Sequence, residues 1–327
     1  MKIRNAWIVF VVTLLITLPL KMYQVWFLVE KSTGFYTDGM RTTGILASVL
    51  AVGSVLMILM CALDRREHAP YSPIRSMSSA VFGVLAGLGV ILGCVASLFG
   101  IQDLQNQIAY SVLTVIGVIA GIVLVITGMN FSKRKNIFAQ QPLLALIPAI
   151  WGCACLVALF TSFVAVVNVA ENVYDTFTVI FMLLFLFHQA KVLARIEDAK
   201  SGIRMYMFGL PAALMALVTG VSGSLGEWIG VTRAGSFPAV FYPVNILLAL
   251  YILSFLAANS KNSVVKVSAD IHEFLRESAD ASEMNAEGKN TDSLRESYSD
   301  YLSEAYNSDI CFLEHTNSPF SAGIEKR

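Results

Sequence analysis

Charged and amide side chains recur at helical spacing within two otherwise apolar stretches of this sequence. Glu171, Asp175 and Thr178 are four and three residues apart, and Lys21 and Gln24 are three residues apart. Residues three or four positions apart share one face of an α-helix, so each set would form a single polar stripe. Carboxylates, an ammonium group and an amide on such stripes could form an ion pair or bind a small solute or ion.

Among these residues, Lys21 would have the highest free-energy cost of insertion into a membrane. If residues 6–28 form a helix that crosses a membrane, Lys21 lies roughly 10 Å inside the outer end of that helix. A lysine at such depth costs about 3 kcal/mol on insertion scales. We therefore expect Lys21 to pair with Asp175, with Glu171 as a weaker partner nearer the surface. The alternative is that Lys21 extends to the membrane surface without a special role.

Further polar groups are expected at a similar depth. Asn245 follows Pro243 in another apolar segment. A water-filled pocket open to the outside would give such groups their partners. Alternatively, hydroxyl groups could bond to the backbone of their own helices. The predicted ligand-binding residues are Lys21, Gln24, Glu171, Asp175, Thr178 and Asn245.

Signals for catalysis, cofactors and metals are weak. The sequence holds no H-E-x-x-H pattern and no phosphate-binding glycine loop. His188 is the one histidine near an apolar segment, whereas haem ligation usually needs paired histidines. A relay between Asp175 and His188 is excluded, because 13 residues of helix would separate them by about 20 Å. We expect His188 at the cytoplasmic boundary. We predict no cofactor, no metal and no catalytic residues, and an enzyme is the less favoured interpretation.

The composition indicates which elements position these residues. The chain is 56% hydrophobic and 14% charged, with a mean hydropathy of +0.67. Soluble domains have roughly 25% charged residues. Because apolar runs of membrane-spanning length recur between short polar breaks, the sequence predicts an all-α, polytopic integral membrane protein with eight transmembrane helices. The predicted segments are residues 6–28, 42–63, 77–100, 108–130, 142–165, 173–194, 205–226 and 237–258.

The first segment resembles a secretion signal in having a basic start and an apolar stretch, "MKIRNAWIVFVVTLLITLPL". No small-x-small cleavage site follows it. We therefore expect a membrane anchor that is retained.

The basic residues predict that both termini are cytoplasmic. One alternate set of polar segments holds Lys2, Arg4, Arg65, Arg66, Arg75, Lys133, Arg134, Lys135, Lys191, Arg195, Lys200 and Arg204. The opposite breaks hold Lys31, Arg41 and Arg233. Cytoplasmic loops carry the excess of lysine and arginine. Aromatic side chains are favoured at the membrane surface, so the outer boundary is predicted near Tyr23, Trp26, Tyr110, Tyr174 and Trp228. We expect a multi-pass protein of the plasma (cell) membrane.

Two further patterns concern packing and loops. Glycines four residues apart predict close contact between segments 77–100 and 108–130; they are Gly83, Gly87, Gly89, Gly93, Gly117 and Gly121. The longest outer break, "EKSTGFYTDGMRTTG", is too short for a domain but could cover a cavity.

The composition changes after the eighth segment, which predicts a transmembrane domain over 1–259 and a cytoplasmic tail over 260–327. The tail has 7 Lys/Arg and 13 Asp/Glu, a net charge of −6, while the whole chain is neutral. We predict an acidic, largely disordered tail with possible short amphipathic helices. The alternative interpretation is that the tail has a function and folds when it binds a cytoplasmic protein partner. No nucleic-acid partner is expected.

Two functions fit these features. The first is a transporter or permease for a small solute or ion, with a polar site in the outer half of the lipid bilayer. The second is a membrane sensor or assembly subunit that binds a ligand outside and a protein partner through the tail.

Overall fold

The computed structural model describes residues 2–31, 35–39, 41–63, 75–99, 104–133, 136–161, 169–196, 201–231 and 238–262. These residues form eight α-helices, a short 3₁₀ helix η1 (Ile137–Ala139) and an isolated β-bridge between Val29 and Tyr36. The α-helices are α1 (Lys2–Phe27), α2 (Arg41–Ala62), α3 (Met77–Phe99), α4 (Leu104–Lys133), α5 (Pro142–Thr161), α6 (Val169–Leu193), α7 (Ser201–Ile229) and α8 (Phe241–Asn262). All eight are long and apolar enough to cross a membrane. The predicted fold class is confirmed: the architecture is that of a multi-pass membrane protein.

The helix ends differ from the predicted segments by a few residues. Helix α7 begins at Ser201 and ends at Ile229, beyond the predicted 205–226 at both ends. Helix α8 begins at Phe241, four residues later than predicted. Backbone hydrogen bonding continues through polar residues at helix ends, so an apolar pattern does not mark the last turn. The predicted amphipathic helices of the tail lie outside the described residues.

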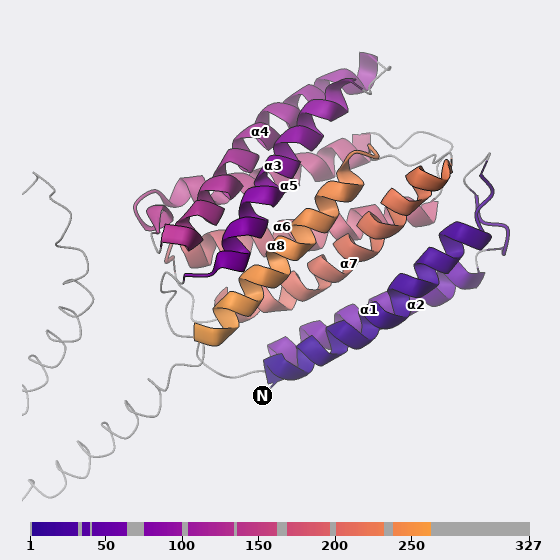
Figure 1. Ribbon diagram of the computed structural model, residues 1–327, viewed down its shortest axis with the longest axis horizontal. Helices are drawn as coiled ribbons and strands as arrows, with labels where there is room; N and C mark the ends of the chain where they lie inside the picture. The colour runs from indigo at the N-terminus through magenta and orange to yellow at the C-terminus, as the bar shows by residue number, and fades with distance from the viewer. Residues whose placement is uncertain are drawn as a thin grey trace, which may run out of the picture. The chain divides into compact units, whose positions relative to one another are not determined.

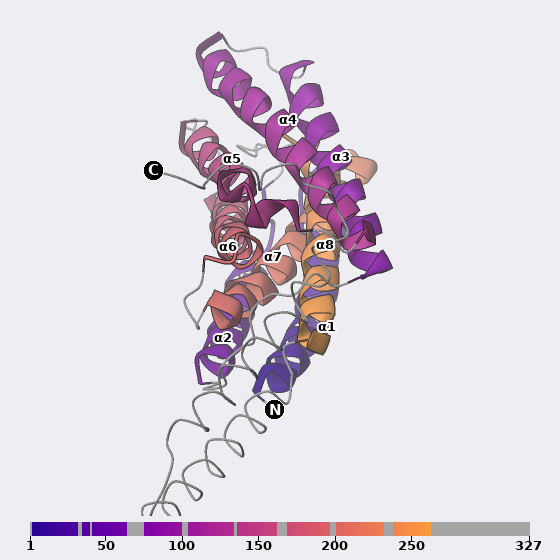
Figure 2. The same ribbon diagram turned by 90° about the vertical axis from the view of Figure 1, so that its left-hand side faces the viewer.

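Six of the helices contact one another in a closed ring. Contacts join α3 to α4, α4 to α5, α5 to α6, α6 to α7, α7 to α8, and α8 back to α3. Helices α1 and α2 pack against each other and against α7, on the side of α7 away from α3 and α4 (Figures 1 and 2). Helix α7 is therefore central, and 72% of the residues in its apolar stretch are buried.

The two ends of the helical bundle are named after residues that lie there. Helix α1 starts at Lys2, and this end is called the Lys2 end. The last turns of α1 lie beside the start of α6, where Lys21 contacts Glu171. This opposite end is called the Glu171 end, and α2 and α8 also begin there.

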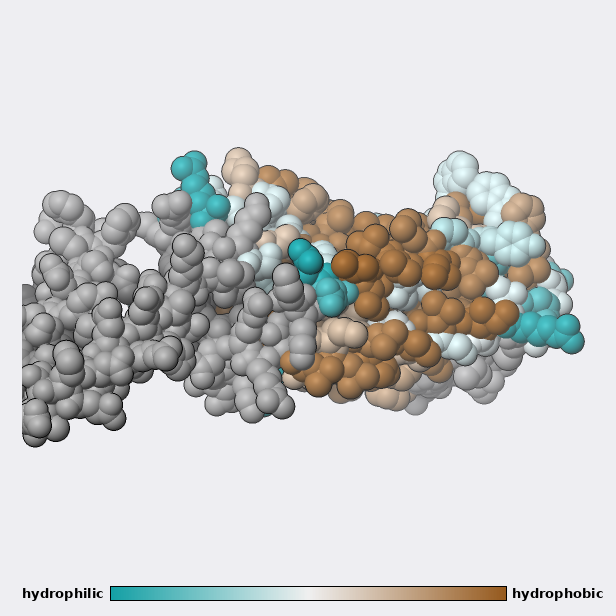
Figure 3. All heavy atoms as spheres, turned by 90° about the horizontal axis from the view of Figure 1, so that it is seen from below, coloured by the Kyte–Doolittle hydropathy of each residue, from teal (hydrophilic) through white to brown (hydrophobic). Residues whose placement is uncertain are grey.

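Large apolar side chains cover the outside of the bundle. Leu15, Leu92 and Leu143 are 68%, 68% and 79% exposed. Figure 3 shows apolar side chains over the middle of one face, with hydrophilic ones towards its ends. A soluble protein seldom exposes so much contiguous apolar surface. Lipid tails would cover it.

The glycine pattern is confirmed in part as a close contact between α3 and α4, whereas Gly89 and Gly93 face Leu247 and Val244 of α8. A Cβ atom on Gly87 would lie 2.6 Å from the carbonyl oxygen of Gly121 and 2.8 Å from the backbone nitrogen of Val125. A Cβ on Gly128 would lie 2.7 Å from the nitrogen of Val84. The two backbones can approach this closely only because these positions lack side chains.

Candidate functional site

A buried ion pair joins α1 to α6 at the Glu171 end. The Nζ atom of Lys21 lies 2.5 Å from Oε1 of Glu171. The Lys21 side chain is fully buried, and Glu171 is 15% exposed. Lys21 also donates a hydrogen bond of 3.0 Å to the hydroxyl of Tyr36, and that hydroxyl donates to the same Glu171 oxygen. The ammonium, hydroxyl and carboxylate groups of these three side chains are thus hydrogen-bonded to one another.

The order of the partners differs from the prediction. We expected Asp175 as the main partner of Lys21, but the ion pair that the structure shows is with Glu171. Asp175 is one helical turn, about 6 Å, farther from the Glu171 end of α6. A lysine near a helix end extends its long side chain towards that end, which favours the carboxylate nearer the surface. Asp175 is itself buried, with 6% exposed.

Two tyrosine rings lie beside the Lys21 ammonium group. Its Nζ atom is 4.8 Å from the centre of the Tyr174 ring and 5.5 Å from that of Tyr36. Such distances allow cation–π attraction. Tyr174, which was predicted near the outer boundary, is 5% exposed, and its hydroxyl donates to the carbonyl of Thr43 at 3.2 Å. Trp228, by contrast, is 80% exposed at the same end.

Gln24 continues the polar stripe of α1 by one turn. It is fully buried, and its amide nitrogen donates to the hydroxyl of Thr43 at 2.6 Å. Its amide oxygen has no hydrogen-bond partner within the described part of the chain. Thr43 thus connects Gln24 to Tyr174, and Tyr174 borders Lys21. The connected residues are Lys21, Gln24, Tyr36, Thr43, Glu171 and Tyr174; together with Asp175, which follows Tyr174 on α6, they are called the Lys21 cluster below.

Tyr36 and Thr43 are cluster members that the sequence did not indicate. Tyr36 lies in the outer break between α1 and α2, where two backbone hydrogen bonds hold the chain: Glu30 to Phe35 at 3.0 Å and Thr37 to Leu28 at 2.9 Å. The sequence suggested only that this break could cover a cavity. Its one signal was a tyrosine within a polar segment next to a membrane-spanning helix.

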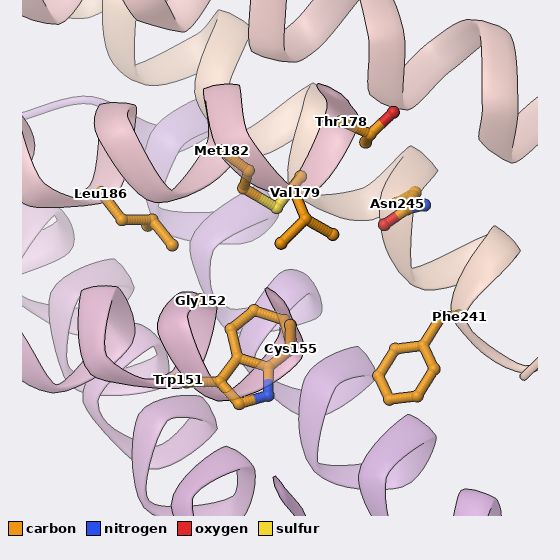
Figure 4. A pocket seen from close by; sticks show the side chains of 9 residues that line it. All are labelled: Trp151, Gly152, Cys155, Thr178, Val179, Met182, Leu186, Phe241 and Asn245. Carbon is orange, nitrogen blue, oxygen red and sulfur yellow. The ribbon is translucent and has the colours of Figure 1, made fainter. Parts of the chain in front are cut away.

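The other two predicted site residues line a separate cavity inside the ring (Figure 4). It lies between α5, α6 and α8 and is lined by Trp151, Gly152, Cys155, Thr178, Val179, Met182, Leu186, Phe241 and Asn245. Its volume is about 20 Å³. This space suffices for about one water molecule.

The polar side chains that line this cavity differ in their hydrogen bonding. The hydroxyl of Thr178 donates to the carbonyl of Tyr174 at 2.7 Å, so it bonds to its own helix, which was the predicted alternative. The amide of Asn245 also lines the cavity, as does the indole of Trp151, whose Nε1 has no hydrogen-bond partner within the described part of the chain (Figure 4). The six predicted residues therefore divide: Lys21, Gln24, Glu171 and Asp175 in the cluster, Thr178 and Asn245 at the cavity.

Aromatic side chains pack against one another in the part of the ring interior nearer the Lys2 end. The ring of Phe255 meets Phe131 at 5.4 Å and Phe185 at 6.0 Å, both edge to face. Tyr251 lies 6.1 Å from Phe255, and its hydroxyl accepts a hydrogen bond from the Gln189 amide. All five side chains are buried. We call this group the aromatic layer.

His188 lies at the Lys2 end of α6, away from the Lys21 cluster. It is 7% exposed and stacks on Phe208 at 5.4 Å. It lies within the last two turns of α6, and the cytoplasmic boundary expected there stays a prediction. Among the described residues, no group of three or more His, Cys, Asp or Glu side chains could hold a metal ion.

Comparison with protein-family models, curated proteins and solved structures finds no match for this chain. Its function is therefore argued from geometry.

Proposed function

We propose that this protein transports a small solute or ion across a membrane, with its binding region at the Glu171 end. The single observation that carries the proposal is the asymmetry of the ring interior. A cavity lined by the amide of Asn245 occupies the part nearer the Glu171 end, and aromatic rings pack across the other part, which we take to be a barrier. A transporter that exposes its site to one side at a time needs a closed barrier on the opposite side.

The polar groups also suit this function. Buried polar and charged side chains within a membrane are costly and mark solute or ion pathways. The α6 stripe runs from Glu171 and Asp175 in the cluster to Thr178 at the cavity. A solute entering at the Glu171 end would meet the cluster first and the cavity next.

We propose that the Glu171 end faces outwards in the plasma membrane, because the basic residues gather at the Lys2 end. Reporter fusions after residues 70, 137, 198 and 262 should report cytoplasm, and fusions near residues 35 and 231 should report the outside. The strongest orientation signal is the run Lys133, Arg134 and Lys135. An outside signal at residue 137 would reject this orientation.

Cys155 offers a test of transport against the alternative, a membrane sensor. It lines the cavity and is 3% exposed, whereas Cys153, two residues away on α5, is exposed on the lipid side. In variants that keep one of these cysteines, a membrane-impermeant thiol reagent added from the Glu171 side should label Cys155 at least about tenfold faster than Cys153, because the reactive thiolate forms in contact with water.

The direction of labelling separates the two functions. A transporter whose site alternates should also allow labelling of Cys155 from the Lys2 side, measured in inverted vesicles. A sensor with a one-sided pocket should allow labelling only from the Glu171 side. Equal labelling of Cys153 and Cys155 from both sides would mean that the cavity does not open to water, and would reject both.

A further inference from the structure

The cavity between α5, α6 and α8 has a wall without charged side chains. Among the described residues that line it, none is an Asp, Glu, Lys, Arg or His. Much of the wall is apolar and comes from Trp151, Val179, Met182 and Leu186 (Figure 4). An ion in such surroundings needs an opposite charge or a set of ligands that replaces its water shell. The wall provides no opposite charge.

The polar side chains of the wall are too few to replace a water shell. They bring two oxygen atoms, one from Thr178 and one from Asn245. Hard cations such as Ca²⁺ and Mg²⁺ take about six to eight oxygen ligands. Nε1 of Trp151 is a hydrogen-bond donor and cannot coordinate a cation. The wall therefore suits an uncharged ligand better than an ion.

The amide of Asn245 can recognise such a ligand. It lines the cavity and makes no hydrogen bond to the part of the chain that the structure describes (Figure 4). An amide has an acceptor oxygen and two donor hydrogens. The hydroxyl of Thr178 already donates to the carbonyl of Tyr174 at 2.7 Å, so it can only accept a further hydrogen bond. A ligand that satisfies both side chains needs a donor and an acceptor, as a hydroxyl or an amide group has.

The size of the cavity limits the ligand. Its volume of about 20 Å³ suffices for about one water molecule. Met182 on the wall is unbranched and flexible, so a movement of its side chain makes room for a few more atoms. The rings of Trp151 and Phe241 offer an apolar surface to a short carbon chain. The ligand is therefore a small molecule with a polar and an apolar part.

We infer that this cavity binds a small uncharged solute with a hydroxyl or amide group, which Asn245 holds by hydrogen bonds. Thr178 accepts a further hydrogen bond from the solute, and the apolar wall contacts its carbon atoms. The inference deepens the proposed function and rests on it for its purpose, because it makes the cargo a neutral solute and not an ion.

Protection of Cys155 from labelling measures binding, because Cys155 lines the same cavity. Full-length protein that keeps Cys155 as its one cysteine is reconstituted in vesicles and treated with the membrane-impermeant thiol reagent from the Glu171 side. Acetamide and glycerol are titrated as probes, and sucrose at the same osmolarity is the control. We expect at least one probe to slow labelling saturably, about threefold at twice its half-saturating concentration. Rubidium chloride should leave the labelling rate unchanged.

Substitutions in the wall test which residues hold the solute. Asn245→Leu should abolish the protection, and Thr178→Val should weaken it. The matched control is Asn130→Leu, which removes a buried amide of α4 outside the cavity and should retain full protection. Undiminished protection in Asn245→Leu would overturn the inference.

Flux through the unmodified protein keeps the inference testable if the variants fail to fold. Radioactive acetamide or glycerol should enter vesicles that contain the protein faster than protein-free vesicles, whereas radioactive rubidium should not. Flux of rubidium without flux of either neutral solute would overturn the inference while leaving transport in place. Protection of Cys155 by a neutral probe, without labelling of Cys155 from the Lys2 side, would keep the inference while rejecting transport. Neither protection nor flux with the neutral solutes would overturn the inference.

Discussion

Replacing Glu171 by glutamine should lower the stability of the protein by about 3–5 kcal/mol, because the change leaves the ammonium group of Lys21 buried without its ion-pair partner. Lys21→Met should be destabilising for the opposite reason, since it leaves the Glu171 carboxylate without its cation. The double variant, Lys21→Met with Glu171→Gln, should recover part of the loss. Thermal unfolding in detergent measures all three.

The matched control is the carboxylate one turn deeper. A second cycle combines Lys21→Met with Asp175→Asn. The coupling free energy between Lys21 and Glu171 should exceed that between Lys21 and Asp175, because the 2.5 Å contact is with Glu171. A larger coupling with Asp175 would contradict this geometry. It would restore the partner that the sequence alone suggested.

The helices could be predicted from the sequence because each apolar run is long enough to cross a bilayer and is bounded by polar residues. The close contact of α3 and α4 was predictable for a similar reason. A glycine every fourth residue permits a backbone approach that other residues forbid, as Gly87 and Gly121 show. These features depend on local patterns within one or two segments.

The partner of Lys21 could not be predicted in the same way. Helical spacing tells which residues share a face, and it placed Glu171 and Asp175 on one stripe. It does not tell how far α1 is displaced along α6, and a displacement of one turn exchanges the two carboxylates. Tyr36 was missed because its position depends on the fold of the break between α1 and α2, which has no periodicity.

The separation of Thr178 and Asn245 from the cluster has the same cause. Both residues are polar and near the Glu171 end, which suggested one site. In the structure the α6 stripe passes from the α1 contact at Glu171 to the α5–α8 interior at Thr178. Which neighbour covers each turn of a helix depends on the whole arrangement of helices. The sequence pattern of α6 alone does not tell which helix covers each of its turns.

Replacing Phe255 by alanine should have the second large effect, on stability and on closure of the ring interior. Phe255 is 1% exposed and contacts three aromatic rings, from α4, α6 and its own helix. Removing a buried phenylalanine ring costs about 3–5 kcal/mol, because it loses these contacts and leaves a cavity. The new cavity would lie in the aromatic layer, between the cavity lined by Asn245 and the Lys2 end. Unfolding of the purified variant measures the stability.

Labelling of Cys155 from the Lys2 side measures the closure, and it should become faster in the Phe255→Ala variant. The control is Phe160→Ala, which removes the same ring from the outside of α5, where Phe160 is 58% exposed. Lipid can fill the space left there, so we expect a small change in stability and none in labelling. If Phe255→Ala unfolds more readily but labelling from the Lys2 side stays unchanged, the aromatic layer stabilises the helices without being the barrier. The asymmetry of the ring interior would then no longer favour transport, and the sensor would become the better proposal.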